Sequence, residues 1–539
     1  MQRLTRISIA TFLLLATAIP CSAAETGGGV KTSSLQTLDY LAIIGYMAII
    51  VVVGIYFARG EKTTDDYFLA GRRVPWWAAT LSIFSTYLSA ITFMSIPATA
   101  FGGNWLTVWM NIGIILVAPV TVFCLLPFFR RLNVTTIYEY LELRFGPGLR
   151  VYGSLAFMTY QVAKMGIFLL LPALALATVT GFNLYLCIAI MGLLCIVYTV
   201  LGGIEAVVWT DVLQSVVLIG GALLCIGMIF SAESFDFEKM WSVAVTEETN
   251  KFSVGNPGEG VFWYFLIGGF FVQLVPFTSD QAVAQRFLTT PDEKSAARSV
   301  WAHAAMVIPA SLLFFGLGTA LYVFYEARPD ALPVAEQKDI IVPWFIATQL
   351  PAGFAGLVIA GLFAATMSSV DSGMHSIATT LTNDVYSKLR PGCADEKRLR
   401  VARYLTVLAG LCGTLAAVFL TFSGLDGGSL WILLLQVVIP IGSALTGVFL
   451  LGVLTTGAHS RGAAAGVIAS MAVVVLFANM ENSPLPHPVL KAAAGVLTCV
   501  VVGYLVSLAI PGPGGSLAGL TLHTAAQEDE TGKKEATNE

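Results

Sequence analysis

The chain has 539 residues, of which 56% are hydrophobic and 12% are charged, and its mean hydropathy is +0.79. Soluble domains carry about 25% charged residues, so this composition excludes a soluble globular protein and predicts a chain that crosses the lipid bilayer many times. The net charge of −4 is too small to indicate a nucleic-acid partner.

The N-terminus has the pattern of a secretory signal peptide. Arg3 and Arg6 precede a short apolar run at 7–19, and small residues follow this run. A basic start, an apolar middle and small residues at the cleavage site define such a signal. We therefore expect residues 1–24 to be removed, which leaves 25–39 as a periplasmic N-terminus. In the alternative, the segment is retained as a signal anchor and adds one helix.

Apolar runs follow along the rest of the chain, and about thirteen of them reach or approach the roughly 20 residues that a membrane-crossing helix needs. The predicted spans are 40–57, 76–98, 106–129, 151–178, 184–201, 207–230, 261–285, 302–325, 342–380, 405–422, 430–454, 463–478 and 490–510. The predicted fold class is therefore an all-α polytopic membrane protein.

Charge in the loops predicts the orientation, because positive residues near helix ends stay in the cytoplasm. Four loops rich in arginine and lysine alternate with loops that are nearly uncharged or acidic. The positive loops lie at 59–73, 130–150, 286–298 and 388–403. This pattern places the mature N-terminus outside, the tail at 512–539 in the cytoplasm and the protein in the inner (plasma) membrane.

The motifs that would power or gate other membrane proteins are missing from the sequence. It contains no GxxxxGK[ST] phosphate-binding loop, which argues against an ATP-driven pump. It also contains no selectivity-filter repeat or ring of acids, which argues against a channel. We therefore expect a secondary transporter rather than an enzyme, with its polar residues gathered at interrupted helices.

Two segments combine hydroxyl-bearing residues with features that interrupt a membrane helix. In residues 85–97 the hydroxyls of Ser85, Thr86, Ser89 and Thr92 precede Pro97, and in residues 364–372 several hydroxyls accompany Asp371. An opened helix frees backbone carbonyls, and hydroxyl and carbonyl oxygens are ligands that hard cations such as sodium prefer. The two segments predict a cation site. Packing between helices is the alternative for each cluster taken alone.

Asp211 and Lys164 are further polar residues within apolar runs. An acid inside a membrane is a functional candidate, although Asp211 lies near the inner end of its helix, where a capping or solvated acid is the alternative. A buried lysine needs either an acid or an anionic solute, and the location of Lys164 favours the solute. Snorkelling and a helix-packing ion pair are the alternatives for Lys164.

Four segments together resemble the sodium:solute symporter family, which includes sodium/glucose and sialic acid transporters. They are 85–97, the run Gly-Gly-Ile-Glu-Ala-Val-Val-Trp-Thr-Asp at 202–211, 279–286 and 368–372, and the similarity spans roughly 35–455. The resemblance implies a LeuT-type architecture of two five-helix inverted repeats. The implied organisation is an accessory helix at 40–57, a ten-helix core at 76–454, two accessory helices at 455–511 and a cytoplasmic tail at 512–539.

The resemblance also implies which residues bind sodium. The main site would consist of Ser85, Leu88, Ala365, Ser368 and Ser369, with Leu88 and Ala365 acting through their carbonyls. A second site, known in some relatives, would consist of Asp211, Ser368, Asp371 and Ser372. Asp371 replaces a serine or threonine of the family pattern, so coupling to one sodium ion and coupling to two are both expected alternatives.

Within the family, the pattern is similar to the bacterial sialic acid transporters, in which an arginine at the position of Lys164 binds the substrate carboxylate. The implied substrate-binding residues are Tyr87, Ser89, Thr92, Asn111, Gln161, Lys164 and Gln273, where Tyr87 replaces a threonine. The expected function is sodium-coupled import of sialic acid or a related sugar acid. A neutral sugar or polyol, with Lys164 paired to a protein carboxylate, is the first alternative; a small carboxylate, proton coupling and a channel are less favoured.

Overall fold

The computed structural model describes residues 35–57, 62–132, 134–233, 235–245, 250–255, 260–332, 340–422, 427–480, 485, 487, 489–510, 517 and 519–524. All regular secondary structure in these ranges is helical. The predicted signal peptide at 1–24 and most of the predicted tail at 512–539 lie outside the described residues.

In the described ranges, eleven helices are long and apolar enough to cross a membrane, or twelve if the bent pair α4 and α5 is one span. The helices that contribute to spans are α2 (Thr37–Phe57), α4 (Trp76–Tyr87), α5 (Ala90–Gly102), α6 (Val108–Val120), η2 (Thr121–Leu125), α7 (Leu126–Arg131), α9 (Pro147–Thr180), α10 (Leu184–Phe230), α12 (Gly260–Ser279), α14 (Glu293–Glu326), α16 (Phe354–Thr380), η5 (Leu381–Tyr386), α17 (Ser387–Leu389), α18 (Asp395–Thr421), α19 (Gly427–Leu454), α20 (Ser460–Asn479) and α21 (Val489–Ala509). The short helices between them are α3 (Thr64–Leu69), η1 (Ala70–Arg72), α8 (Tyr138–Phe145), α11 (Phe237–Val245), α13 (Gln281–Leu288), η3 (Pro329–Ala331) and α15 (Ile341–Gln349).

Helix α10 explains why this count is lower than the predicted thirteen. Its 47 residues are counted as one helix. A straight helix of this length would extend about 70 Å, which is more than twice the thickness of the bilayer core. Gly203 interrupts it with φ 52° and ψ −152°, a backbone conformation that favours glycine. The interruption falls between the predicted spans 184–201 and 207–230. The total of thirteen is not confirmed and stays a prediction.

Two other predicted spans are wrong as continuous helices. The span at 342–380 is divided into α15 and α16, because Leu350 is extended before Pro351 and Gly353 has a φ of 86°. The span at 261–285 is divided into α12 and α13 at Asp280. The second division places a polar residue at a helix break inside the bundle.

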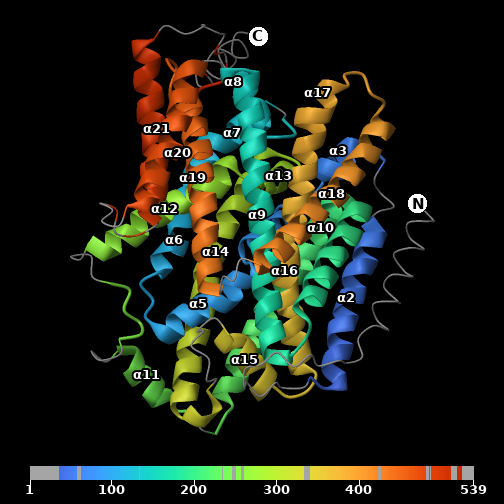
Figure 1. The fold of residues 1–539 in the computed structure, drawn as a ribbon, viewed down its shortest axis with the longest axis vertical. Coiled ribbons are helices and arrows are strands. Elements are labelled where there is room, and N and C mark those ends of the chain that lie inside the picture. The colour runs from blue at the N-terminus through green and yellow to red at the C-terminus, as the bar shows by residue number, and fades with distance from the viewer. Residues whose placement is uncertain are drawn as a thin grey trace, which may run out of the picture.

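Helix α16 lies in the middle of the bundle, with α2 on one side and α20 and α21 on the other (Figure 1). In its membrane segment 89% of the residues are buried, against 28% for α2 and 33% for α20. The hydroxyl-rich residues of α16 therefore face other helices rather than lipid.

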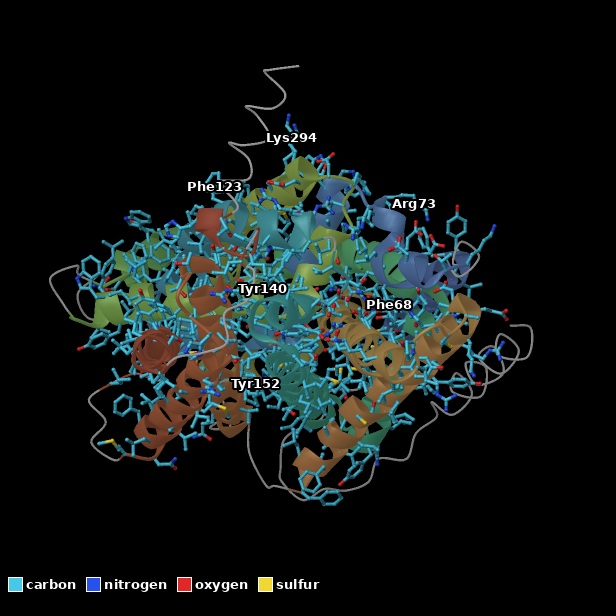
Figure 2. The ribbon with its side chains drawn as sticks, turned by 90° about the horizontal axis from the view of Figure 1, so that it is seen from above. Phe68, Arg73, Phe123, Tyr140, Tyr152 and Lys294 are labelled. Carbon is cyan, nitrogen blue, oxygen red and sulfur yellow. The ribbon has the colours of Figure 1, made fainter. Side chains whose placement is uncertain are left out.

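Short helices lie at the two ends of the bundle. Helices α8 and α17 lie toward the upper end of Figure 1, and α11 and α15 lie toward the lower end. Figure 2 looks down on the upper end and shows Arg73 and Lys294 near its margin, while Tyr140 lies further inward. Helix α11, at the opposite end, carries one acid and one base, Glu238 and Lys239.

A carboxylate joins α2 to the start of α16. The Oδ1 atom of buried Asp39 accepts hydrogen bonds from the backbone N–H groups of Gly353 at 2.8 Å and Gly356 at 2.7 Å. The first N–H groups of a helix have no partner within it, and the helix dipole favours a negative charge there. A Cβ atom on Gly356 would lie 2.3 Å from the backbone of Asp39. Close approach and capping together fix α2 against the central helix.

The packing of α5 against α14 leads to a testable prediction. A Cβ atom on Gly318 would lie 2.2 Å from the carbonyl oxygen of Pro97, whereas a Cβ on Gly316 would meet nothing within 4 Å. We expect Gly318→Ala to reduce the free energy of unfolding by about 1–3 kcal/mol through overpacking. Gly316→Ala is the matched control and should not lower the melting temperature of the purified protein. Equal melting temperatures for the two variants would contradict the prediction.

Candidate functional site: a helix break beside a cavity

The α4–α5 pair is interrupted within the segment where its composition predicts a break. Helix α4 ends at Tyr87 and α5 begins at Ala90, and their axes are bent by 61°. Leu88 has non-helical angles, φ −78° and ψ 83°. Pro97, in contrast, lies inside α5 and does not mark the break. Such a break takes carbonyl groups out of the helical hydrogen-bond pattern and leaves them available to a ligand.

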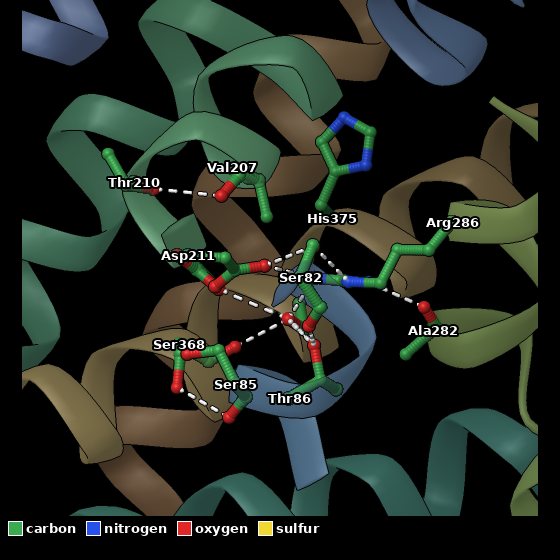
Figure 3. Close-up of polar contacts among 12 residues, drawn as sticks. Ser82, Ser85, Thr86, Val207, Thr210, Asp211, Ala282, Arg286, Ser368 and His375 are labelled. Atoms are coloured by element: carbon green, nitrogen blue, oxygen red, sulfur yellow. Dashed lines mark hydrogen bonds and ion pairs between the residues drawn. The ribbon is translucent and has the colours of Figure 1, made fainter. Parts of the chain in front are cut away.

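Helix α16 places two hydroxyls against the end of α4. The Oγ atom of Ser368 lies 2.9 Å from the carbonyl oxygen of Ser85 and 3.2 Å from that of Ala365. The Oγ atom of Ser369 lies 3.3 Å from the carbonyl oxygen of Thr86 and 3.4 Å from that of Ala365. Figure 3 shows Ser368 facing Ser85. The structure thus brings together an all-oxygen set whose chemistry suits sodium.

Of the five residues predicted for the main sodium site, four belong to this oxygen cluster: Ser85, Ala365, Ser368 and Ser369. The fifth, Leu88, lies at the break itself. The carbonyl of Thr86 is an additional oxygen that the sequence analysis did not include.

A buried ion pair lies next to the oxygen cluster (Figure 3). Arg286 of α13 donates from Nη2 to Asp211 Oδ2 at 3.0 Å, and neither side chain is exposed to solvent. Its Nε and Nη1 atoms donate to Ser82 Oγ at 2.7 Å and to the carbonyl of Ala282 at 2.5 Å. It also contacts the hydroxyl of Ser372. The expectation that Arg286 belongs to a cytoplasmic loop is therefore wrong, because its charge is matched inside the protein.

The structure links the four residues predicted for a second sodium site through Ser372, which contacts Arg286, the carbonyl of Ser368 and the carboxylate of Asp371. Asp211 is paired with Arg286, whereas Asp371 accepts hydrogen bonds from Tyr198 OH at 2.5 Å and from Ser372 Oγ at 3.2 Å. In this conformation the positively charged group beside Asp211 is the guanidinium of Arg286.

A cavity of about 440 Å³ opens beside the helix break. Six of the seven predicted substrate residues line it: Tyr87, Ser89, Thr92, Asn111, Lys164 and Gln273. Aromatic and aliphatic side chains form most of the remaining wall, as is usual for a small-molecule site.

Gln161 is the exception among the predicted substrate residues. It is buried and does not line this cavity. A Cβ atom on Gly373 of α16 would lie 2.6 Å from its Nε2 atom, so Gln161 packs between α9 and α16. Gln161 lies one helical turn before Lys164, and both polar atoms of its side chain lack a hydrogen-bond partner, so its role in substrate binding stays a prediction.

Lys164 forms an ion pair on the cavity wall. Its Nζ atom lies 3.5 Å from Asp280 Oδ2, and the two side chains are 18% and 2% exposed. The other oxygen of Asp280 accepts a hydrogen bond from the backbone N–H of Ala282 at 2.8 Å, which caps α13. The sequence analysis missed Asp280, although an aspartate directly before an amphipathic helix is a signal for such a cap.

His303 is a second cavity residue that the sequence analysis did not select. It is fully buried, and its ring lies 5.3 Å from that of Tyr87 and 5.6 Å from that of Phe277. Neither ring nitrogen has a hydrogen-bond partner, and the hydroxyl of Tyr87 has none either. His303 and Tyr87 therefore line the cavity with unused polar atoms, and Phe277 packs behind them.

Comparison with known proteins identifies relatives over most of the chain. A family model described as the sodium:solute symporter family matches residues 67–470. The chain is 37% identical to the sodium/sialic acid symporter NanT of Aliivibrio fischeri over 484 residues, which cover 88% of this chain and 94% of that protein. It is 36% identical to the sodium/sialic acid symporter SiaT of Proteus mirabilis over 444 residues, or 81% and 89% of the two chains.

Solved structures agree with these relationships. A sodium-coupled sialic acid symporter in a substrate-bound outward-open state has a TM-score of 0.81 and 34% identity, with 89% of this chain and 99% of that chain covered. The nucleobase-cation-symport-1 transporter Mhp1 has a TM-score of 0.56 at 16% identity, which is a likeness of fold alone. The architecture is of the LeuT type, and the chain belongs to the sodium:solute symporter family.

Proposed function

We propose that this protein is a sodium-coupled symporter that imports sialic acid, or a closely related sugar acid, by alternating access. The observation that carries the proposal is the position of Lys164, on the wall of a cavity that adjoins the oxygen cluster. A lysine supplies a positive charge to a carboxylate. The hydroxyls of Ser89 and Thr92 and the amides of Asn111 and Gln273 supply partners for the hydroxyl groups of a sugar.

Sodium is proposed to bind between α4 and α16. Its ligands are the carbonyls of Ser85, Leu88 and Ala365 with the hydroxyls of Ser368 and Ser369. Since the residues around the break also line the cavity, sodium and solute occupy neighbouring positions and each raises the affinity for the other by the same factor. A second sodium ion at Asp211, Ser368, Asp371 and Ser372 would lie beside the guanidinium of Arg286, which bonds to Oδ2 of Asp211 and leaves Oδ1 without a hydrogen-bond partner.

The proposed membrane is the inner (plasma) membrane, with the mature N-terminus outside and the C-terminus in the cytoplasm. The arginine and lysine residues of the loops predicted to be cytoplasmic support this orientation. In the proposed organisation α2, α20 and α21 are accessory helices around the ten-helix core.

Uptake by the purified full-length protein in proteoliposomes tests the function. An inward sodium gradient should drive accumulation of labelled sialic acid well above the level reached with an equal potassium gradient. Equal uptake under both gradients would exclude sodium coupling. Competition by hexoses or inositol, without competition by sugar acids, would favour a neutral sugar as the solute.

The sodium site has its own test in Ser369→Ala. The variant removes one oxygen ligand, and a hydrogen bond or ligand contact to a charged group contributes about 1.5–3 kcal/mol, so we expect half-maximal uptake to require about tenfold more sodium. Thr366→Val is the matched control, because Thr366 also lies on α16 but its hydroxyl bonds to Leu362 of its own helix at 3.0 Å. A sodium titration of uptake with the same shift in both variants would argue against the assignment.

A further inference from the structure

We propose that Asp280 balances the affinities of the two ligands: its charge strengthens sodium binding and weakens the binding of the anionic solute. The inference rests on the proposed function and concerns the same cavity. Asp280 acts in it as a positioning residue, because it works through Lys164 and through its charge and not as a ligand of either.

The ion pair between Lys164 and Asp280 is the first observation. Their charged atoms are 3.5 Å apart on the wall of the cavity, and they are its only lysine, arginine, aspartate or glutamate residues among those described. Before any ligand binds, the two charges cancel. A solute carboxylate that binds Lys164 must therefore share it with a carboxylate that is already present.

The fixed position of Asp280 is the second observation. Its Oδ1 atom is held by the backbone N–H of Ala282 at 2.8 Å, and its side chain is almost completely buried. The cap anchors the carboxylate at the α12–α13 break, so the charge stays at the wall when a solute enters. A buried negative charge without a partner is costly, and a second anion beside it adds to that cost.

The neighbourhood of the oxygen cluster completes the argument. Thr86 lines the cavity, and its carbonyl lies 3.3 Å from Ser369 Oγ in the proposed sodium site. A sodium ion there adds one positive charge next to the cavity. With Lys164, Asp280, sodium and a solute carboxylate all present, the positive and negative charges are equal in number. Asp280 thus favours the state in which sodium binds before the solute.

Asp280→Asn removes the negative charge but keeps the helix cap, because asparagine caps a helix about as well as aspartate. Binding is measured by titration calorimetry on the detergent-solubilised full-length protein, with sodium alone and with sialic acid at saturating sodium. We expect sodium to bind about tenfold more weakly and sialic acid about tenfold more tightly than in the unaltered protein. One neighbouring charge changes the ionisation constant of a group by about tenfold or more, and the expected shifts are at the lower end of that range. Asp280→Glu should keep both affinities near their original values.

Asp292→Asn is the matched control. Asp292 caps α14 by accepting from the N–H of Ser295 at 2.7 Å, but it is exposed and does not line the cavity. Neither affinity should change in this variant. If Asp280→Asn does not fold, Asp280→Ser removes the same charge with another capping residue and should give the same opposite shifts.

Opposite shifts distinguish a charge effect from damage to the structure, which would weaken both ligands. A loss of both affinities in a folded variant, or no change in either, would overturn the inference. If the unaltered protein does not bind sialic acid in the presence of sodium, the proposed function itself is contradicted. If the unaltered protein binds both ligands but Asp280→Asn gives no opposite shifts, only the role of Asp280 is contradicted.

Discussion

Replacement of Lys164 by alanine is expected to reduce sialic acid uptake about thirtyfold or more. The substitution removes the cation from a buried charge pair on the cavity wall and leaves Asp280 to repel the solute carboxylate. Truncating one partner of such a pair costs about 2–5 kcal/mol, which corresponds to a loss of this size. The initial rate of sodium-driven uptake in proteoliposomes measures the effect.

Three comparisons isolate the role of Lys164. Lys164→Arg keeps the positive charge and should retain most of the uptake. The double variant Lys164→Ala with Asp280→Asn contains no unpaired charge, and it should still fail to bind the sugar acid if the solute needs the lysine itself. A neutral analogue that binds the unaltered protein should lose little affinity in Lys164→Ala. Full retention of sugar-acid uptake in this variant would exclude the carboxylate role.

The second large effect is expected from Asp211→Asn. This change leaves the guanidinium of Arg286 uncompensated in the interior, and breaking a buried pair in this way costs about 3–5 kcal/mol. Thermal unfolding of the purified variant should show a clearly lower melting temperature. Glu396→Gln breaks an exposed pair with Arg400 and should cost less than about 1 kcal/mol.

A double variant tests whether charge explains this loss. Arg286→Met removes the positive charge that Asp211→Asn leaves behind, and pairs replaced by apolar residues are often as stable as the original. Asp211→Asn combined with Arg286→Met should therefore be more stable than Asp211→Asn alone. Additive losses from the two changes would show that the pair contributes no coupling energy.

Local features of the sequence predict a large part of this structure. Apolar runs locate the membrane helices, since each must supply enough length to cross the bilayer by itself. The hydroxyl-rich segments near Ser85 and Ser368 predict the break and its partner, because few other functions place so many oxygens inside a membrane. Pro97 is misleading in this respect, because the surrounding bundle accommodates a proline within a continuous helix.

The remaining features depend on contacts between distant parts of the chain. Arg286 has the sequence pattern of a loop cation at the end of an apolar run, and its burial depends on Asp211, 75 residues earlier. Asp280 likewise meets Lys164 across 116 residues. The family resemblance selects six of the cavity residues. A protein carboxylate paired with Lys164 is among the alternatives that the sequence offers, but the sequence does not identify Asp280 as that carboxylate. Only the three-dimensional arrangement brings these charges together.

The cap that Asp39 provides for α16 has a consequence for how the protein is made. Asp39 and Gly353 are 314 residues apart in the chain. At about 5–20 residues per second, the ribosome needs roughly 15–60 s to synthesise the segment between them. Helix α2 also packs against α10, where a Cβ atom on Gly54 would lie 2.6 Å from Tyr198, so α10 can hold α2 while the rest of the chain is made. The hydrogen bonds from Asp39 to α16 are therefore among the later contacts of the bundle to form, because they need α16 to be in the membrane.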